Sequence, residues 1–180
     1  MRELKHKNII KLEDMKITQN HYYLVMDFCN GGTLSECLRK YQKKNKKPFS
    51  VEIVQYLMRQ IIDGIRYIHN KNIIHRDLKL DNIIIDFGLS THIEKSNLCY
   101  STLGSPINMD PNILIKMNEN KLGINIGKKV GYDQKADIWS LGTLCYEMLI
   151  GKPAFNSKNL QELVQKVESG SYSIPISLSK

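Results

Sequence analysis

The 180-residue chain contains no run of 18 apolar residues, so we expect no membrane-spanning helix. Cysteine is scarce as well, and its four copies show no spacing typical of a metal site or a disulfide framework. They lie at Cys29, Cys37, Cys99 and Cys145, and we expect reduced thiols in a cytoplasmic protein. Residues 1–7 are charged and hold no apolar segment, so we expect no secretory signal there.

Acidic residues are in deficit. Against 26 Lys and Arg there are 18 Asp and Glu, which gives a formal net charge of +8. Part of the excess is local, in five lysines at positions 40, 43, 44, 46 and 47. Tyr41 alone interleaves with them, whereas nucleic-acid sites combine basic patches with several aromatic residues. A solvated loop is therefore favoured, and no nucleic-acid partner is expected.

The remaining composition is that of a soluble globular protein, with 42% apolar and 24% charged residues. The length suits one domain with its own core. Residues 1–6 predict the end of a helix. Residues 9–17 and 22–27 are rich in Ile, Leu, Val and Tyr and predict two strands, with Gln19–Asn20 as the turn between them.

Two helices should follow. Thr33 and Glu36 have the spacing of a capping box, which predicts the start of a short helix. Its inner face would carry Leu34, Leu38 and Tyr41. Ser50 is the expected N-cap of a long helix. The apolar stripe of this second helix recurs in steps of three and four, at Val51, Val54, Met58, Ile61, Ile65 and Ile68.

The second half of the chain is less regular. Residues 90–102 are polar, residues 104–106 and 110–111 predict turns, and residues 117–131 predict a flexible loop. Asp133 should cap a helix that ends at Gly151, with a buried stripe of Ile138, Leu141, Cys145 and Met148. Ser157 should cap a last helix carrying Leu160, Leu163, Val164 and Val167. Two strands followed by several helices predict an α+β fold.

The stretch from His75 to Gly88 carries the chemistry. Asp77 could accept a proton from a hydroxyl, and Lys79 could balance charge on a phosphate. Asn82 and Asp86 offer oxygen ligands of the kind that Mg²⁺ prefers. His-Arg-Asp alone is most often a surface turn, and so is Asp-Phe-Gly. Both in this order, with Leu78 and Asn82 in place, form a far more specific pattern.

This pattern resembles the catalytic loop and the metal-binding motif of protein kinases, H-R-D-L-x-x-x-N followed by D-F-G. Residues 4–10, 23–29, 104–111 and 137–142 resemble further kinase segments in the same order. Asp-Leu-Lys at Lys79 is typical of serine/threonine kinases. The Thr-Leu pair after Gly-Gly at residues 31–34, together with residues 104–111, looks most similar to the autophagy-initiating (uncoordinated-like) kinases.

The resemblance implies a protein-kinase-like α+β fold. Residues 1–28 would be a remnant of the N-lobe and hinge, and residues 29–180 a mainly helical C-lobe without its last helices. The implied reaction transfers a phosphoryl group from Mg-ATP to Ser or Thr hydroxyls of proteins. Asp77 would accept the proton, Lys79 would stabilise the phosphoryl group, and Asn82 with Asp86 would hold Mg²⁺.

The resemblance also assigns the nucleotide pocket. Met26 would be the gatekeeper, although it is equally a core methionine. The Asp27 carbonyl and the Cys29 N–H would face the adenine edge. Ile84 would pack on the adenine ring, although a plain strand residue would look the same.

Regulation is implied by Arg76, which would pair with a phosphate on the activation segment. The candidate acceptors are Ser96, Ser101 and Thr102. Ser105 would hydrogen-bond Asp77 and Lys79, and Asp137 would hold the backbone of the catalytic loop.

Several features depart from the family pattern. No glycine-rich loop precedes Met1, and the strand lysine and its glutamate partner are absent. Asn82 and Asp86 are four residues apart, where the family has about a dozen residues forming a hairpin. Asn112 stands where a glutamate is usual. Three explanations remain: a fragment or mis-assembled product of an active kinase, which we favour; a short pseudokinase; or joined pieces. We expect weak activity, with an inactive pseudokinase or interaction module as the alternative.

Overall fold

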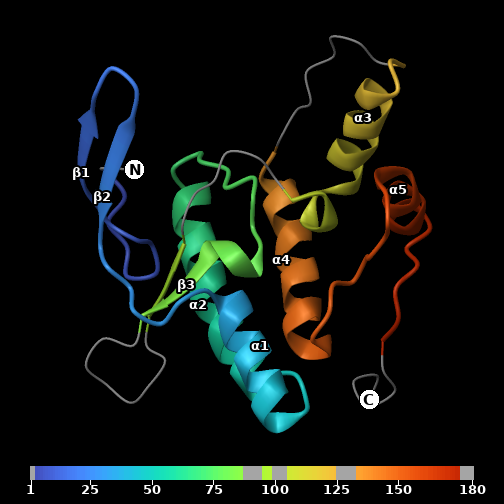
Figure 1. Ribbon diagram of the computed structural model, residues 1–180, viewed down its shortest axis with the longest axis horizontal. Helices are drawn as coiled ribbons and strands as arrows, with labels where there is room; N and C mark the ends of the chain where they lie inside the picture. The colour runs from blue at the N-terminus through green and yellow to red at the C-terminus, as the bar shows by residue number, and fades with distance from the viewer. Residues whose placement is uncertain (1–2, 87–94, 99–104, 125–132, 175–180) are drawn as a thin grey trace.

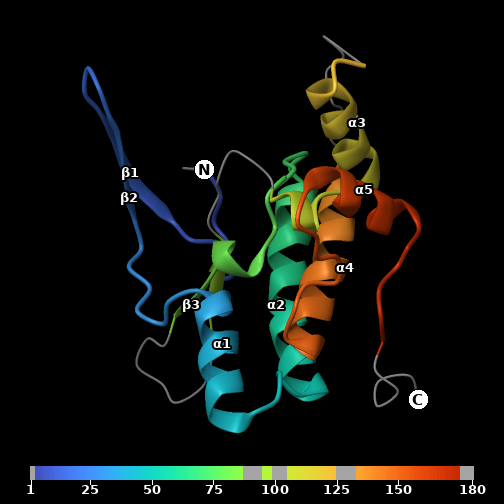
Figure 2. The same ribbon diagram turned by 45° about the vertical axis from the view of Figure 1, so that its right-hand side comes forward.

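The computed structural model describes residues 3–86, 95–98, 105–124 and 133–174; for Asp86 and residues 95–98 it describes only the backbone. A helical body carries a narrow two-stranded hairpin that projects to one side (Figures 1 and 2). Strands and helices segregate, which confirms the α+β prediction.

The projecting hairpin consists of β1 (Leu12–Ile17) and β2 (Tyr22–Met26). The two strands pair antiparallel from Ile17 opposite Tyr22 to Leu12 opposite Met26, with an irregularity near Leu12. Thr18 N–H donates to the His21 carbonyl at 2.9 Å, so the turn lies at Gln19–Asn20 as predicted.

The segment before the hairpin was predicted wrongly. Residues 3–6 form no helix, and the first strand begins at Leu12 rather than at residue 9. The buried side chains of Leu4, Ile9 and Ile10 do not recur at helical spacing. This segment is instead held by a residue far along the chain, because the Lys5 N–H donates to the Tyr67 hydroxyl at 3.0 Å.

Helices α1 (Leu34–Asn45) and α2 (Val51–His69) form the next layer. The predicted capping box is present: Thr33 Oγ1 accepts the Glu36 N–H at 3.2 Å, and Glu36 Oε2 accepts the Thr33 N–H at 3.3 Å. Ser50 occupies the N-cap position of α2, but its side chain makes no capping bond. Val51 is exposed rather than buried, and Leu57 takes a place in the core that the predicted stripe missed.

The chain then forms η1 (Leu80–Asn82), β3 (Ile83–Asp86) and β4 (Lys95–Leu98), with β3 and β4 antiparallel. After η2 (Pro106–Asn108), α3 (Pro111–Lys121) begins at Asp110, whose carboxylate accepts the Asn112 N–H. The predicted turn at residues 110–111 is therefore a helix start. The loop predicted from residue 117 begins five residues too early, because α3 continues to Lys121.

Helix α4 (Gln134–Ile150) runs through the centre of the body, and α5 (Leu160–Glu168) packs beside α3 (Figure 1). Asp133 caps α4 and Gly151 ends it with φ of 81°, as predicted. Ile138 was wrongly placed in the core, since it is 57% exposed. Asn159 rather than Ser157 caps α5.

Two apolar clusters meet at α4. The larger one joins α1, α2, β3 and the α2-facing side of α4, with Ile61, Ile83 and Leu144 fully buried. The smaller one joins α3, α5 and the other side of α4, around Leu114 and Phe155. Because α4 is buried on two sides, a single stripe at helical spacing could not describe its environment.

Candidate functional site

The loop from His75 to Asn82 lies between α2 and β3 and is held by apolar residues. Leu78 and Leu80 are buried, and so are Ile83 and Ile85 on the strand that follows. This packing fixes the backbone on both sides of Lys79, whose side chain stays partly exposed. Polar side chains of the loop therefore project from a rigid support.

Asp137 of α4 holds the start of this loop. Its carboxylate accepts the His75 N–H at 2.8 Å and the Arg76 N–H at 2.9 Å. Arg76 has φ of 72°, which a side chain other than glycine adopts at a cost of about 1–2 kcal/mol. Since Asp137 is 1% exposed, these bonds form in a low-dielectric interior where they are strong. The predicted contact of Asp137 with the loop backbone is confirmed.

His69, at the end of α2, completes this arrangement and was not predicted. Its Nε2 lies 2.7 Å from Asp137 Oδ2, and its side chain is 11% exposed. The Gln134 side chain donates to the His69 carbonyl at 2.8 Å. The one available signal was a polar residue directly after the apolar stripe that ends at Ile68.

Asp77 is the centre of the site and is almost fully buried. Asn82 Nδ2 donates to the Asp77 carbonyl at 2.7 Å and to Asp77 Oδ2 at 2.6 Å. Lys79 Nζ lies 3.3 Å from the same Oδ2. Asp77, Lys79 and Asn82, the three residues predicted to be catalytic, therefore come together around one carboxylate.

Ser105 reaches Asp77 from a distant part of the chain. Its backbone N–H, rather than its hydroxyl, donates to Asp77 Oδ1 at 2.9 Å. Between the described atoms of Ser105 and Lys79 no bond is found, so half of the predicted contact is present. Thr143 and Ser140 of α4 fix this turn, through bonds to the side chain and carbonyl of Asn108 at 3.2 and 2.7 Å.

Of the residues predicted to contact adenine, Ile84 lies on β3, beside the segment that follows the hairpin. Thr33 and Ile84 form a β-bridge, and the Ile85 backbone exchanges bonds of 2.8 Å with Gly31 and Gly32. The segment that follows the hairpin thus lies against β3. Ile84 is half-buried there.

The remaining adenine-side residues stay predictions. Met26 and Cys29 are half-buried and Asp27 is exposed. The Asp27 N–H donates to the Lys11 carbonyl at 3.2 Å. This bond holds the Asp27 backbone against the residue that precedes β1.

The magnesium site implied by the family does not fit the backbone of β3. The strand continues from Ile83 to Asp86 without a turn, and Asp86 pairs with Lys95 of β4. At about 3.3 Å per residue, Asp86 lies roughly 13 Å from Asn82 along the chain. Ligands of one Mg²⁺ need oxygens at about 2 Å from the ion, so this pair is not arranged to share one.

No cluster of three or more His, Cys, Asp or Glu residues that could hold a metal is found among the described side chains. None of the described helices is long and apolar enough to cross a bilayer. The predicted phosphate acceptors Ser101 and Thr102 lie outside the described residues, and so does the side chain of Ser96. The Arg76 side chain is exposed.

One carboxyl group beside the site has a shifted pKa. Burial raises the pKa of Glu147 on α4, and the charge of Asp81 in the catalytic loop adds to the rise. The folded chain therefore retains the Glu147 proton to a higher pH than the unfolded chain does.

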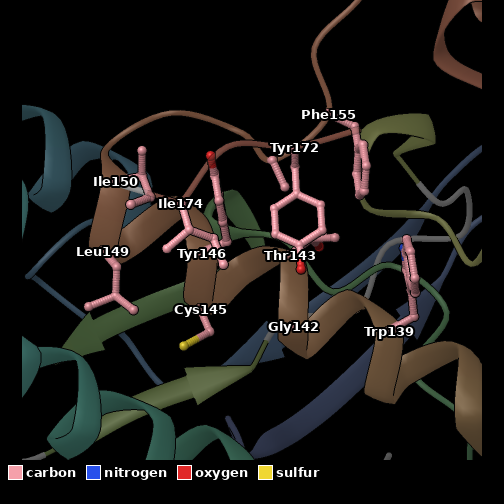
Figure 3. Close-up of a pocket in the computed structure, with 11 residues that line it drawn as sticks. Trp139, Gly142, Thr143, Cys145, Tyr146, Leu149, Ile150, Phe155, Tyr172 and Ile174 are labelled. Carbon is pink, nitrogen blue, oxygen red and sulfur yellow. The ribbon is translucent and has the colours of Figure 1, made fainter. Parts of the chain in front are cut away.

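A separate cavity of about 490 Å³ lies between α4 and residues 154–174 (Figure 3). Trp139, Tyr146, Leu149, Phe155 and Tyr172 supply most of its apolar wall, and no charged residue lines it. A phosphate-bearing ligand would find no cation there. This cavity is therefore not the nucleotide site.

Comparisons with known proteins identify the family of the chain. The family profile "Protein kinase domain" matches residues 1–177. The chain is 31% identical, over 99% of its length, to serine/threonine-protein kinase atg1 of Dictyostelium discoideum and covers 26% of that protein. It is 32% identical, over 91% of its length, to human serine/threonine-protein kinase ULK1 and covers 16% of it.

A third relative is calcium-dependent protein kinase 4 of Plasmodium berghei (strain Anka), with 34% identity over 98% of this chain and 32% of that protein. The chain thus spans about a third or less of the length of these relatives. Because the family profile covers nearly every residue, the chain belongs to the protein kinase family, and the relatives atg1 and ULK1 are serine/threonine-protein kinases.

Proposed function

We propose that this chain transfers the terminal phosphoryl group of ATP to Ser and Thr hydroxyls of proteins, at a low rate. The arrangement around Asp77 carries the proposal. A buried carboxylate faces an ammonium at 3.3 Å and an amide at 2.6 Å, as acceptance of a hydroxyl proton beside a phosphate requires. The ammonium of Lys79 and the amide of Asn82 both belong to the loop whose backbone is fixed by buried leucines.

Each residue then has a defined part in the reaction. Asp77 orients the substrate hydroxyl and takes its proton. Lys79 places a positive charge beside the phosphoryl group as negative charge develops on its oxygens. Asn82 fixes the Asp77 carboxylate and carbonyl, so that the carboxylate keeps one orientation.

The low rate follows from β3. Family members hold Mg²⁺ between residues equivalent to Asn82 and Asp86, and the ion neutralises the phosphates. Because β3 separates these two positions, we infer that they share no ion. Proton acceptance and charge balance by Asp77 and Lys79 would supply only part of the usual acceleration.

Regulation and location are proposed from the chain's own residues. Arg76 is exposed and adjacent to Asp77, so a phosphate on Ser101 or Thr102 could pair with its guanidinium. The three described cysteines, Cys29, Cys37 and Cys145, form no disulfide, which suits a cytoplasmic location.

The test is phosphoryl transfer from γ-labelled ATP to a mixed Ser/Thr protein substrate. Asp77→Asn should lower the rate by about 100-fold or more, because a general base contributes that much. The matched control is Asp81→Asn, an exposed carboxylate four residues further along the same loop, which should retain its rate. Equal rates for Asp77→Asn and the unmodified chain would remove Asp77 from this role.

A second function is favoured by β3 itself. With its metal positions separated, the chain could serve as a non-catalytic module that keeps a kinase fold. Thermal unfolding with and without Mg-ATP separates the two readings, because a bound ligand stabilises the folded state. A rise in Tm of several degrees supports nucleotide binding, whereas no rise together with no transfer supports the module.

A further inference from the structure

Seven basic residues gather at one end of the molecule, which we call the basic end. They come from the second half of α1, the loop between α1 and α2, and the residue that follows Gly151. All are exposed: Arg39, Lys40, Lys43, Lys44, Lys46, Lys47 and Lys152. They make up about a quarter of the 26 basic residues of the chain.

The fold brings these residues together. Gln42 Nε2 donates to the Gly151 carbonyl at 3.1 Å, which places Lys152 beside α1. The Lys46 N–H donates to the Gln42 carbonyl at 2.8 Å and closes the helix with φ of 58°. The connection between α1 and α2 forms one tip of the molecule, with the end of α4 beside it (Figures 1 and 2).

Few acidic residues adjoin the basic end along the chain, and Glu147, one turn before Gly151 on α4, is half-buried. Residues 37–51 contain no Asp or Glu, and Glu36 is bound at the opposite end of α1 by the capping box. Glu52, at the start of α2, is the nearest acid that follows. Among the described residues, none of the seven forms an ion pair, whereas Lys11, Arg66, Lys79 and Lys166 do. The tip therefore presents a positive field to solvent.

Three kinds of polyanion could meet this field. Single-stranded nucleic acid would need aromatic side chains on which bases stack. Tyr41 is the aromatic residue among these lysines, and its ring packs inward on Phe49 at 5.0 Å between centroids. An acidic peptide usually binds in a groove. The cavity of Figure 3 shares no residue with the basic end.

A protruding tip with six lysines and one arginine suits a broad anionic surface. Lysine acts as a compact point charge, and clusters of four to eight basic residues are typical of contacts with acidic lipids. We propose that the basic end docks onto membranes through their anionic phospholipid headgroups. Docking would be electrostatic, without insertion of apolar side chains.

Docking at this tip leaves the catalytic loop accessible. Helix α1 has 12 residues and is therefore about 18 Å long. Thr33 at its N-cap pairs with Ile84, two residues after Asn82, while its C-terminal end carries the lysines. A membrane at the basic end thus lies well away from Asp77.

The test is co-sedimentation of the chain with phosphatidylcholine vesicles, with and without phosphatidylserine. We expect binding to the phosphatidylserine vesicles alone, and weaker binding as salt rises. Each basic side chain near such a surface contributes about fivefold, so Lys43→Gln with Lys44→Gln should weaken binding by roughly 25-fold. Lys40→Gln with Lys47→Gln is a second pair with the same expected loss, in case the first disturbs α1.

The matched control is Lys116→Gln with Lys121→Gln, two exposed lysines on α3 at the far end of the molecule (Figure 1). It removes the same charge and should change binding by less than about twofold, since it lies beyond the Debye length. Equal losses for the test pairs and the control would overturn the proposal. So would equal binding to both vesicle types, or tighter binding to single-stranded DNA than to the anionic vesicles at the same salt.

Discussion

Replacing Asp137 with alanine should destabilise the chain by about 3–5 kcal/mol. The carboxylate accepts two backbone N–H groups, of His75 and Arg76, and lies 2.7 Å from His69 Nε2. Alanine offers no acceptor, and a buried donor that loses its partner costs about 1–3 kcal/mol. Two such donors and the lost contact with His69 give the predicted total.

The measurement is urea unfolding of the Asp137→Ala chain, with hydrogen exchange of the His75 and Arg76 amides as the local readout. A loss of about 3 kcal/mol corresponds to a fall in amide protection of roughly 150-fold where exchange follows unfolding. Asp137→Asn keeps one acceptor oxygen, so its free energy of unfolding should lie between those of the unmodified chain and of Asp137→Ala.

The control is Asp133→Ala on the same helix. Asp133 is exposed and caps α4 through the Lys135 N–H at 2.9 Å, so its loss should cost about 1 kcal/mol. If Asp137→Ala destabilises the chain no more than Asp133→Ala does, the buried carboxylate does not hold the loop, and the reasoning is refuted.

Three further predictions concern packing, capping and pH. Leu144→Ala on α4 should lower the free energy of urea unfolding by about 2–5 kcal/mol, because it opens a buried cavity. Ile138→Ala on the same helix should lower it by less than about 0.5 kcal/mol. Similar losses for the two variants would contradict the burial of Leu144 and the exposure of Ile138. Thr33→Ala should lower stability by about 1 kcal/mol through loss of the capping box, and Thr33→Ser should restore most of it. The raised pKa of Glu147 means that its stabilising contribution is full below the unfolded-state pKa and is lost as pH rises through the folded one. Glu147→Gln should therefore raise Tm at neutral pH relative to the unmodified chain but not under acidic conditions; an unchanged difference across this range would exclude the shift.

The sequence predicts those residues of the site that lie close to one another along the chain. Asp77, Lys79 and Asn82 lie within six residues, so the loop alone can bring their side chains together. Asp137 and Ser105 were identified through the family resemblance, which supplies long-range contacts that residue spacing does not. His69 and Asn108 were missed because a lone polar residue gives no local sign of a distant partner.

The errors in the fold have a common physical origin. Ile138 and Val51 were assigned to the core by helical spacing, but tertiary packing decides which side of a helix is buried. At residues 3–6 and 117–121, local composition suggested the wrong state, since contacts with other elements outweigh propensity there. The capping residues Thr33 and Asp133 were predicted correctly because a cap depends on residues only two or three positions away.

The setting of Asp77 and the implied metal site depend on different parts of the fold. Helix α4 supplies both supports of Asp77: Asp137 holds the start of the loop, and Ser140 with Thr143 holds the turn that brings Ser105 to the carboxylate. Because these contacts belong to the packed interior, they persist in any chain that keeps α4 folded.

The second metal position depends instead on a reversal of the chain after β3. The four residues that follow Asn82, Ile83–Asp86, form a strand and cannot also form a hairpin. A kinase fold can therefore retain the geometry of its catalytic acid after the metal pair has been separated. For this chain, the ratio of transfer rates for Asp77→Asn and Asp81→Asn is thus a more direct measure of catalysis than the presence of the loop itself.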